Sequence, residues 1–358
     1  MRNSSSLRLL LAAGAAAALV ACGGSASNSG GSAAQPTADV GSGQLQGAGS
    51  TFVDPFFTKA FYQYNADHPK VSVNYQSIGS GGGIQQFTKG TVDFGATDVP
   101  MTAAEVAAAG GDAALVQLPS TIGVAAISYN LPAVDNLKLD GATLADIYLG
   151  KIKTWDDPKL KALNSGAKLP SSAITVVHRS DGSGTSYAFT DYLSKVSPEW
   201  KSTVGVGKSV QWPAGTGGKG NEGVGQAVKS TDGAIGYVEL AYVIQSKLQT
   251  AQVKNHSGKF VAPSIGGATA AAATLQGLSP TNFSITDAPG DSAYPISTYS
   301  WVMLKTNQAD PQKGKALVEL FKWLVTGGQP ISKDLQYAPL PKEASNFSLA
   351  QLKKVKVA

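Results

Sequence analysis

Residues 174–186 read Ile-Thr-Val-Val-His-Arg-Ser-Asp-Gly-Ser-Gly-Thr-Ser, and they are the most informative part of the chain. It begins as an apolar strand, turns through Gly, Ser and Thr, and opens at Tyr187 into a helical pattern that runs to Lys195. Such a turn presents backbone N–H groups and hydroxyls to an anion at a helix start, and Arg179 adds a planar guanidinium. The stretch therefore predicts an α/β unit that binds a small oxyanion.

The same alternation of strand and helix continues along the chain. Strand patterns occupy 71–75, 92–96, 115–129, 234–238 and 301–304. Helical patterns occupy 56–65, a segment from Ile84, 143–151 and 314–326. This order favours a layered α/β fold in which ligand loops lie at the carboxyl ends of strands.

Three further loops rich in small polar residues fall at such junctions, at 47–55, 78–83 and 94–100. A cleft between two lobes would bring them together. Extended crossings near 118–122 and 295–298 would connect the lobes. We therefore expect one lobe made of 44–118 and 296–358, and a second lobe at 119–295.

The N-terminus has the pattern of an export signal. Arg2 and Arg8 precede an apolar run that is too short for a membrane span of about 20 residues. The run ends in Leu19-Val-Ala-Cys22, which resembles the lipobox of bacterial lipoproteins. We expect 1–21 to be a signal peptide and Cys22 an acylated N-terminus that anchors the exported chain on the extracytoplasmic face of the membrane. An ordinary secretory signal is the alternative.

Composition predicts a tether after the signal peptide and argues against an internal disulfide and nucleic-acid binding. Residues 22–43 are mostly Gly, Ser, Ala, Asn and Gln, which predicts a flexible tether. Cys22 is the single cysteine, so an anchored chain forms no internal disulfide. Removal of 1–21 takes two arginines and no acid from a net charge of +5, and the resulting +3 is too mild to indicate nucleic-acid binding.

The histidines and residues 218–223 do not indicate a metal or dinucleotide site. The three histidines, at 68, 178 and 256, are isolated, so we expect no metal site. Residues 218–223 match the letters of a dinucleotide-binding motif, but no clear strand precedes them, and we interpret them as a surface loop. No cofactor is expected.

Several motifs in order resemble the phosphate-binding protein of the bacterial high-affinity ABC phosphate transporter. The motifs are 47–52, 78–83, 92–98, 144–152 with 155–157, 181–186, Trp212, 217–221 and 234–239. The resemblance runs from Leu45 to the C-terminus. It implies a two-lobed fold of the type II periplasmic-binding-protein class, which closes on one phosphate and delivers it to the permease subunits of an ABC importer. It also implies a monomer with no enzyme activity.

The resemblance also implies the ligand set. The hydroxyl of Thr51, the backbone N–H of Phe52 and the hydroxyl of Ser80 would donate from the first lobe. Arg179, held by Asp181, would donate from the second lobe together with donors at the start of the following helix. Those donors are Ser183, Gly184 and Thr185, and Asp98 is the one acceptor.

Asp98 leads us to expect that the site distinguishes phosphate from sulfate. Monohydrogen and dihydrogen phosphate carry an O–H that a carboxylate can accept, whereas sulfate at neutral pH has only acceptor oxygens. An unpaired buried charge is costly, so sulfate should bind about a hundredfold more weakly or worse. The alternative role for Asp98 is a helix cap or turn residue before Pro100. We also expect Asp54 to cap the helix at Phe56, and His178 to point away from the ligand.

Other functions remain open at this point. A phosphatase or phosphotransferase would use Ser183 or Thr185 as nucleophile, but no general base is visible beside either hydroxyl. A receptor for arsenate would fit the same site, because arsenate has the proton pattern of phosphate. A surface interaction protein that merely kept the fold is a further alternative.

Overall fold

The computed structural model describes residues 39–358, of which Val40–Ala358 form one compact unit. The predicted signal peptide, Cys22 and most of the predicted tether lie outside the described residues. The tether boundary at 43 is too late. Val40 already packs against the core, and the amide of Ser42 donates to the carbonyl of Gln312 at 3.3 Å.

Strands and helices alternate as expected. The strands are β1 (Gly43–Gly49), β2 (Val71–Ser77), β3 (Phe94–Thr97), β4 (Leu115–Tyr129), β5 (Lys138–Leu139), β6 (Thr175–Arg179), β7 (Thr216–Gly218), β8 (Ala234–Glu239), β9 (Gln249–Thr250), β10 (Gln252–Lys254), β11 (Phe260–Val261), β12 (Ser297–Lys305), β13 (Asn307–Gln308) and β14 (Lys356–Val357). The helices are α1 (Asp54–Asp67), α2 (Ser80–Lys89), α3 (Ala103–Ala108), α4 (Gly141–Tyr148), α5 (Pro158–Leu163), α6 (Gly184–Val196), α7 (Pro198–Thr203), α8 (Gly220–Ser230), α9 (Leu240–Ser246), α10 (Ile265–Ala272), α11 (Pro311–Leu324), α12 (Pro330–Asp334) and α13 (Lys342–Leu352).

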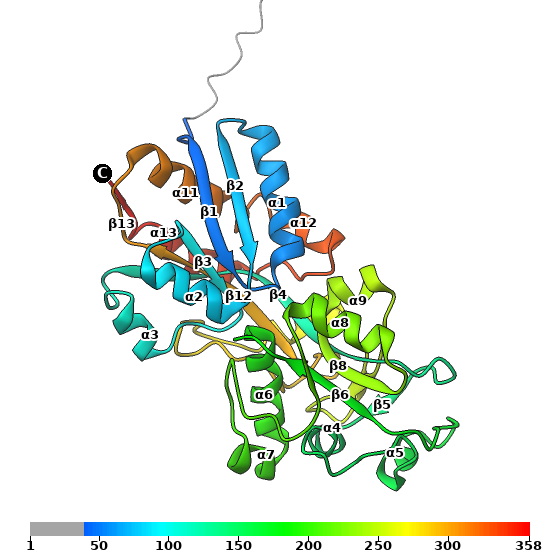
Figure 1. Ribbon diagram of the computed structural model, residues 1–358. Coiled ribbons are helices and arrows are strands. Elements are labelled where there is room, and N and C mark those ends of the chain that lie inside the picture. The colour runs from blue at the N-terminus through cyan, green and yellow to red at the C-terminus, as the bar shows by residue number, and fades with distance from the viewer. Residues whose placement is uncertain (1–38) are drawn as a thin grey trace, which may run out of the picture. The chain divides into compact units, whose positions relative to one another are not determined.

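The main sheet of the described residues has nine strands in the order β2-β1-β3-β12-β4-β8-β6-β7, with β9 also paired to β4. The long strand β4 connects its two halves, as Figure 1 shows. It pairs antiparallel with β12 through Val124 and with β8 from Ala125 onward. The mixed α/β fold is therefore confirmed, and β4 and β12 are its crossing strands.

Two predicted boundaries are wrong for one reason. Helix α2 starts at Ser80 rather than Ile84, and α6 starts at Gly184 rather than Tyr187. Glycine has low helix propensity, so these first turns have the pattern of loops. In α2 the glycine serves packing instead, because a Cβ on Gly83 would lie 2.4 Å from the Cα of Gly49 in β1.

The segment at 218–223 also differs from expectation. Strand β7 feeds directly into α8, and Gly220 and Asn221 are buried. A Cβ on Gly218 would lie 2.7 Å from the amide nitrogen of Val224, so the strand and helix are too close for a side chain there. The prediction of a surface loop is therefore wrong.

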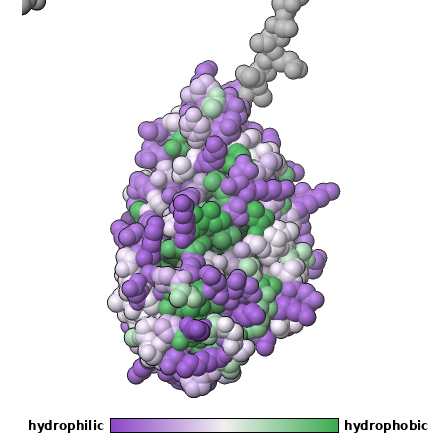
Figure 2. Space-filling view, turned by 90° about the vertical axis from the view of Figure 1, so that its right-hand side faces the viewer, coloured by the Kyte–Doolittle hydropathy of each residue, from purple (hydrophilic) through white to green (hydrophobic). Residues whose placement is uncertain are grey.

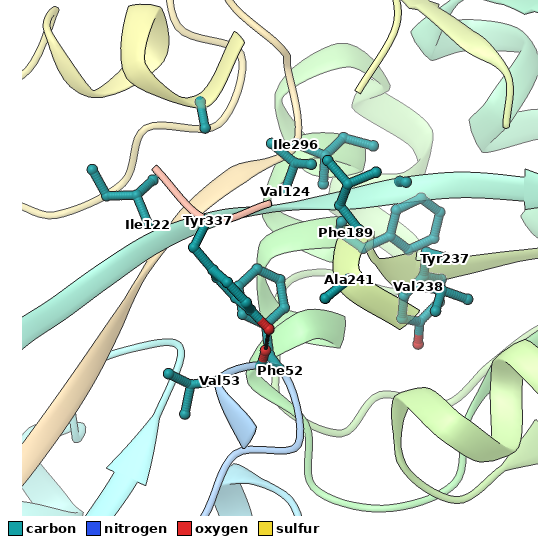
Figure 3. Close-up of a cluster of buried hydrophobic side chains, with 14 of the residues drawn as sticks. Phe52, Val53, Ile122, Val124, Phe189, Tyr237, Val238, Ala241, Ile296 and Tyr337 are labelled. Carbon is teal, nitrogen blue, oxygen red and sulfur yellow. Dashed lines mark hydrogen bonds between the residues drawn. The ribbon is translucent and has the colours of Figure 1, made fainter. Parts of the chain in front are cut away.

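A buried cluster surrounds the crossing strands (Figure 3). The ring of Phe52 meets the ring of Tyr337 edge to face at 6.3 Å, beside Ile122 and Val124 of β4. The hydroxyl of Tyr337 donates to the carbonyl of Phe52 at 2.6 Å. These contacts fix the loop between β1 and α1 against the centre of the sheet. Elsewhere the aromatic side chains of Trp155, Tyr148 and Trp301 are fully buried.

The surface is largely hydrophilic. Figure 2 looks from the side that carries α1 and α9 in Figure 1, and shows hydrophobic patches separated by hydrophilic side chains. Large hydrophobic side chains that are well exposed include Tyr62 at 71% and Ile244 at 51%. Within residues 39–358 no helix has the length and hydropathy needed to cross a membrane.

Replacing Tyr337 with Phe should lower the free energy of unfolding by about 1–2 kcal/mol, because the buried carbonyl of Phe52 loses its donor. Urea unfolding measures the change. Tyr62→Phe is the matched control, since that hydroxyl is exposed. Equal stability of the two variants would contradict the anchoring role.

Candidate anion-binding site

Four segments that are distant in sequence meet near the crossing strands. They are the loop between β1 and α1, the start of α2, the end of β3 and the turn between β6 and α6. The structure brings together every residue of the predicted ligand set and buries each of them. These residues are Thr51, Phe52, Ser80, Asp98, Arg179, Ser183, Gly184 and Thr185.

The turn between β6 and α6 supplies a helix start. Ser183 is the N-cap of α6, and its hydroxyl oxygen accepts from the amide of Ser186 at 3.0 Å. The amide of Gly184 donates to the hydroxyl oxygen of Ser80 at 3.0 Å. A Cβ on Gly184 would lie 2.6 Å from Asp98, so only glycine lets the helix start come this close to the carboxylate. The positive end of the helix therefore lies against Asp98.

Arg179 is held in one orientation. Its Nε and Nη2 donate to the two carboxylate oxygens of Asp181 at 2.8 and 2.6 Å, and Nη1 donates to the hydroxyl of Thr185 at 3.2 Å. Burial raises the pKa of Asp181, but the hydrogen bond and charge of Arg179 outweigh it and leave that pKa below its usual value. These bonds use three of the five guanidinium N–H groups, which leaves one on Nη1 and one on Nη2 for a further acceptor.

Asp98 lies directly after β3 with 1% of its surface exposed. The hydroxyl of Ser50 lies 2.7 Å from both carboxylate oxygens, and the hydroxyl of Ser300 donates to Oδ1 at 2.7 Å. Burial raises the pKa of Asp98 to about 6, although these hydroxyls and the charge of Arg179 lower it. Asp98 does not cap a helix, because Thr102 is the N-cap of α3, the next helix. The site therefore contains one buried carboxylate among donors.

Asn221 belongs to this cluster and was not predicted as a site residue. Its backbone amide and Nδ2 both donate to the hydroxyl oxygen of Thr51, at 3.1 and 2.9 Å. Nδ2 also lies 3.3 Å from the hydroxyl oxygen of Thr185. Both threonine oxygens thus act as acceptors here and keep their own protons for another acceptor. The motif at 217–221 was the sequence signal that pointed to this residue.

Phe52, Asp54 and His178 lie near this cluster and make different contacts. The amide of Phe52 donates to the hydroxyl oxygen of Ser50 at 3.0 Å, and its ring lies in the core. Asp54 is not a helix cap, because α1 begins at Asp54 itself and its N-cap, Val53, makes no side-chain bond. His178 stacks on Trp212 at 4.8 Å, and its Nδ1 lies 3.0 Å from the carbonyl oxygen of Arg179. These contacts place its ring on an aromatic neighbour outside the hydroxyl cluster.

The donors and the carboxylate suit a small anion that carries a proton. Around Ser183 and Thr185, the hydrogen-bond partners found in the described part of the chain are N–H groups, which cannot take a hydroxyl proton. Residues 39–358 hold no group of three or more His, Cys, Asp or Glu side chains arranged to bind a metal ion. The arrangement is built for binding by hydrogen bonds.

Comparison with known proteins gives one consistent family. A family model described as a PBP superfamily domain matches residues 33–326. The chain is 46% identical to the phosphate-binding protein PstS of Pasteurella multocida, over 86% of this chain and 90% of that protein.

Solved structures share the fold. A phosphate-binding protein from Stenotrophomonas maltophilia has a TM-score of 0.66 at 22% identity, over 86% of this chain and 94% of that one. A high-affinity periplasmic phosphate-binding protein solved with phosphate has a TM-score of 0.68 at 21% identity, over 86% and 93%.

The raised pKa of Asp98 makes a stability prediction. A carboxyl whose pKa is about 6 when folded and 3.8 in its ordinary state binds a proton more readily in the folded protein. Its ionisation therefore costs no stability below about pH 4, an increasing amount between pH 4 and 6, and roughly 3 kcal/mol above pH 6. Asp98→Asn removes this cost.

We expect anion-free Asp98→Asn to be more stable than the unsubstituted protein by about 1–3 kcal/mol at pH 7, with no gain at pH 4. Urea unfolding at the two pH values measures it. Asp112→Asn, at an exposed position, is the control. A difference that does not change with pH would refute the assignment of a buried, ionised carboxylate.

Proposed function

The chain belongs to the PstS family of phosphate-binding proteins, and from this premise we propose that the buried cluster around Asp98 and Arg179 binds inorganic phosphate. The protein would capture phosphate outside the cytoplasm and deliver it to the permease subunits of an ABC importer. The observation that carries the proposal is one buried carboxylate facing the guanidinium, hydroxyl and helix-start donors of the site.

The donors, the acceptor and the supporting carboxylate of the site would have different roles in phosphate binding. The free N–H groups of Arg179 and the hydroxyls of Thr51, Ser80, Ser183 and Thr185 would donate to phosphate oxygens. The amides of Phe52 and Gly184 donate to the hydroxyl oxygens of Ser50 and Ser80 in this structure, and the ligand would share them. Asp98 would accept the phosphate O–H. Asp181 would hold Arg179 without touching the ligand, as its two bonds to the guanidinium support.

We also propose that the anion binds between two lobes that close on it. One lobe would contain 44–118 and 296–358, and the other 119–295. Contacts that join residues of the two proposed lobes include the bonds of Gly184 to Ser80, Gly81 to Gly182, Asn221 to Thr51, and Lys208 to Glu105. This network is the expected form of a closed receptor.

Export and anchoring rest on the sequence of the first residues. Cleavage before Cys22 and acylation of that cysteine would tether a monomeric receptor to the membrane through 22–39. Mass spectrometry of the native protein tests this, because an acylated N-terminal cysteine adds the mass of its lipid. An unmodified N-terminus at another residue would favour an ordinary secreted form.

Hydrolysis of phosphomonoesters is the competing function. The hydroxyls of Ser183 and Thr185 have N–H groups as partners. This disfavours hydrolysis, since a nucleophilic hydroxyl needs a base that takes its proton. Release of phosphate from a phosphomonoester by the purified protein would support the enzyme instead. Simple retention of phosphate would support the receptor.

Calorimetric titration tests the proposed ligand. After unfolding and refolding to remove bound anion, the protein should bind one phosphate tightly and sulfate about a hundredfold more weakly or worse. Arsenate should compete with phosphate, because it also carries a proton. Comparable affinity for sulfate and phosphate at pH 7 would contradict the role of Asp98 as proton acceptor.

A salt bridge at the side of the site should slow ligand release. The Lys208 Nζ lies 2.6 Å from Glu105 Oε1, and the carbonyl of Lys208 accepts from the amide of Ser183 at 2.8 Å. Lys208 thus connects the anion turn to α3. Glu105→Gln should raise the rate constant of phosphate release by roughly two- to fivefold, the effect of an ion pair worth about 0.5–1 kcal/mol.

Stopped-flow kinetics with a phosphate chase measures this rate constant. Glutamine keeps the cap of α3, because the N3 position of a capping box accepts Glu or Gln. Lys159→Gln breaks a salt bridge to Asp146 within one proposed lobe and serves as control. If Glu105→Gln and Lys159→Gln release phosphate at the same rate, the bridge has no part in closure.

A further inference from the structure

The strongest unassigned feature is the pair of buried serines on Asp98. We infer that Ser50 and Ser300 are positioning residues that set anion selectivity, because Ser300 donates to Oδ1 of Asp98 and Ser50 is shared by both oxygens, which leaves Oδ2 with the greater capacity to accept a proton from the ligand. The inference rests on the proposed phosphate site and adds the residues that enforce its choice.

The two carboxylate oxygens of Asp98 have unequal partners. Oδ1 accepts from Ser300 at 2.7 Å and also shares the hydroxyl of Ser50 at 2.7 Å. Oδ2 has only the shared Ser50 hydroxyl and a long contact of 3.5 Å to the hydroxyl of Ser80. Since Ser50 has one proton and shares it between the two oxygens, Ser300 makes Oδ1 the more occupied oxygen and Oδ2 keeps more acceptor capacity.

Oδ2 also lies on the side of the anion donors. The position that a Cβ would take on Gly184 is 2.6 Å from Oδ2, so this oxygen faces the start of α6. The amide of Gly184 and the hydroxyls of Ser183 and Thr185 belong to that helix start. An oxyanion held by them would meet Oδ2 first.

Ser300 is held in place by an irregularity in the sheet. Along β12 the pairing with β4 shifts between Ser300, which lies opposite Thr121, and Trp301, which lies opposite Pro119. The skipped residue, Ser120, donates from its hydroxyl to the carbonyl of Ser300 at 3.1 Å. Such bulges re-aim side chains next to functional sites. On the same strand the hydroxyl of Thr298 donates to the backbone carbonyl of Asp98 at 2.9 Å. Strand β12 therefore holds the backbone of Asp98 through Thr298 and its carboxylate through Ser300.

Ser50 is oriented by its other partner. Its oxygen accepts from the amide of Phe52 at 3.0 Å, and its own amide donates to the carbonyl of Ala96 at 2.9 Å. With the oxygen occupied as an acceptor, the hydroxyl proton is directed at Asp98. Ser50 therefore connects a predicted donor of the site to its acceptor.

The chemical consequence concerns the proton on Asp98. Ionised, Asp98 accepts from a protonated anion and repels sulfate, but once protonated it becomes a donor that sulfate can use. Burial favours the protonated form, while Ser50, Ser300 and Arg179 favour the ionised one. The other titratable groups whose charge couples to Asp98 are Glu239, Tyr75 and Tyr337. Loss of one serine should therefore admit sulfate at a higher pH.

The test compares phosphate and sulfate affinity of the full exported chain from pH 5 to 8, with Ser300→Ala and Ser300→Thr. In Ser300→Ala the ratio of phosphate to sulfate affinity at pH 7 should fall about tenfold, the loss of one charge-assisted hydrogen bond. The pH below which sulfate binds should also rise. Ser300→Thr keeps the hydroxyl and should restore both readouts.

Ser297→Ala is the matched control, because Ser297 lies on the same strand, is equally buried and donates to the carbonyl of Tyr294 instead. A Ser300→Ala protein with the same ratio and pH profile as Ser297→Ala would overturn the inference while leaving phosphate binding in place. Failure of the unsubstituted protein to bind phosphate would overturn the proposed function and the inference together. If Ser300→Ala does not fold, Ser50→Ala is measured against the same control and with the same two outcomes.

Discussion

Asp98 is a buried carboxylate that must be ionised to accept a proton from an anion, and the neighbouring segments are arranged around that charge. An unpaired charge in the interior is expensive, so Asp98 needs donors from several directions at once. The loop after β1 supplies Ser50, β12 supplies Ser300, and α2 supplies the more distant Ser80. Arg179 adds a compensating charge from the other half of the sheet. This arrangement costs the folded chain free energy, and in return the carboxylate gives the site an acceptor for a proton of the ligand.

The fold meets this demand by keeping several backbones unusually close. Gly184 lets α6 start against Asp98, and Gly83 lets α2 pack on β1. Strand β4 joins the two halves of the sheet and lies next to the Phe52 and Tyr337 contact that fixes the first anion loop (Figure 3). Packing at the crossing strands and hydrogen bonds between the halves bring donors from both halves of the sheet close to Asp98. A binding protein of this design gains affinity from preorganisation.

Much of this was readable in the sequence because strand ends and glycine-rich turns have local signatures. The turn at 181–186, the loops around Thr51 and Ser80, and Asp98 after its strand were all placed correctly as neighbours. Ser300 was not predicted, since a serine in an apolar strand has no local pattern and its partner is set by the register of β12 on β4. Ser50 lies in the motif at 47–52, but the sequence did not show that its hydroxyl contacts Asp98. Asn221 was noticed in a motif, but its segment was misjudged because β7 is only three residues long. The early starts of α2 and α6 were missed because tertiary packing overrides the low helix propensity of glycine.

Counting the protons exchanged during binding shows whether Asp98 accepts the proton of the bound anion. Titration of phosphate into the protein at pH 5, in two buffers that differ in ionisation enthalpy, gives the number of protons released per phosphate bound. Asp98 is protonated in most free molecules at this pH, since its pKa is about 6, and must ionise to accept from the ligand. We therefore expect the unsubstituted protein to release close to one proton more per phosphate bound at pH 5 than Asp98→Asn does. At pH 7 this difference should be close to zero. Equal proton release by the two proteins at pH 5 would contradict this role of Asp98.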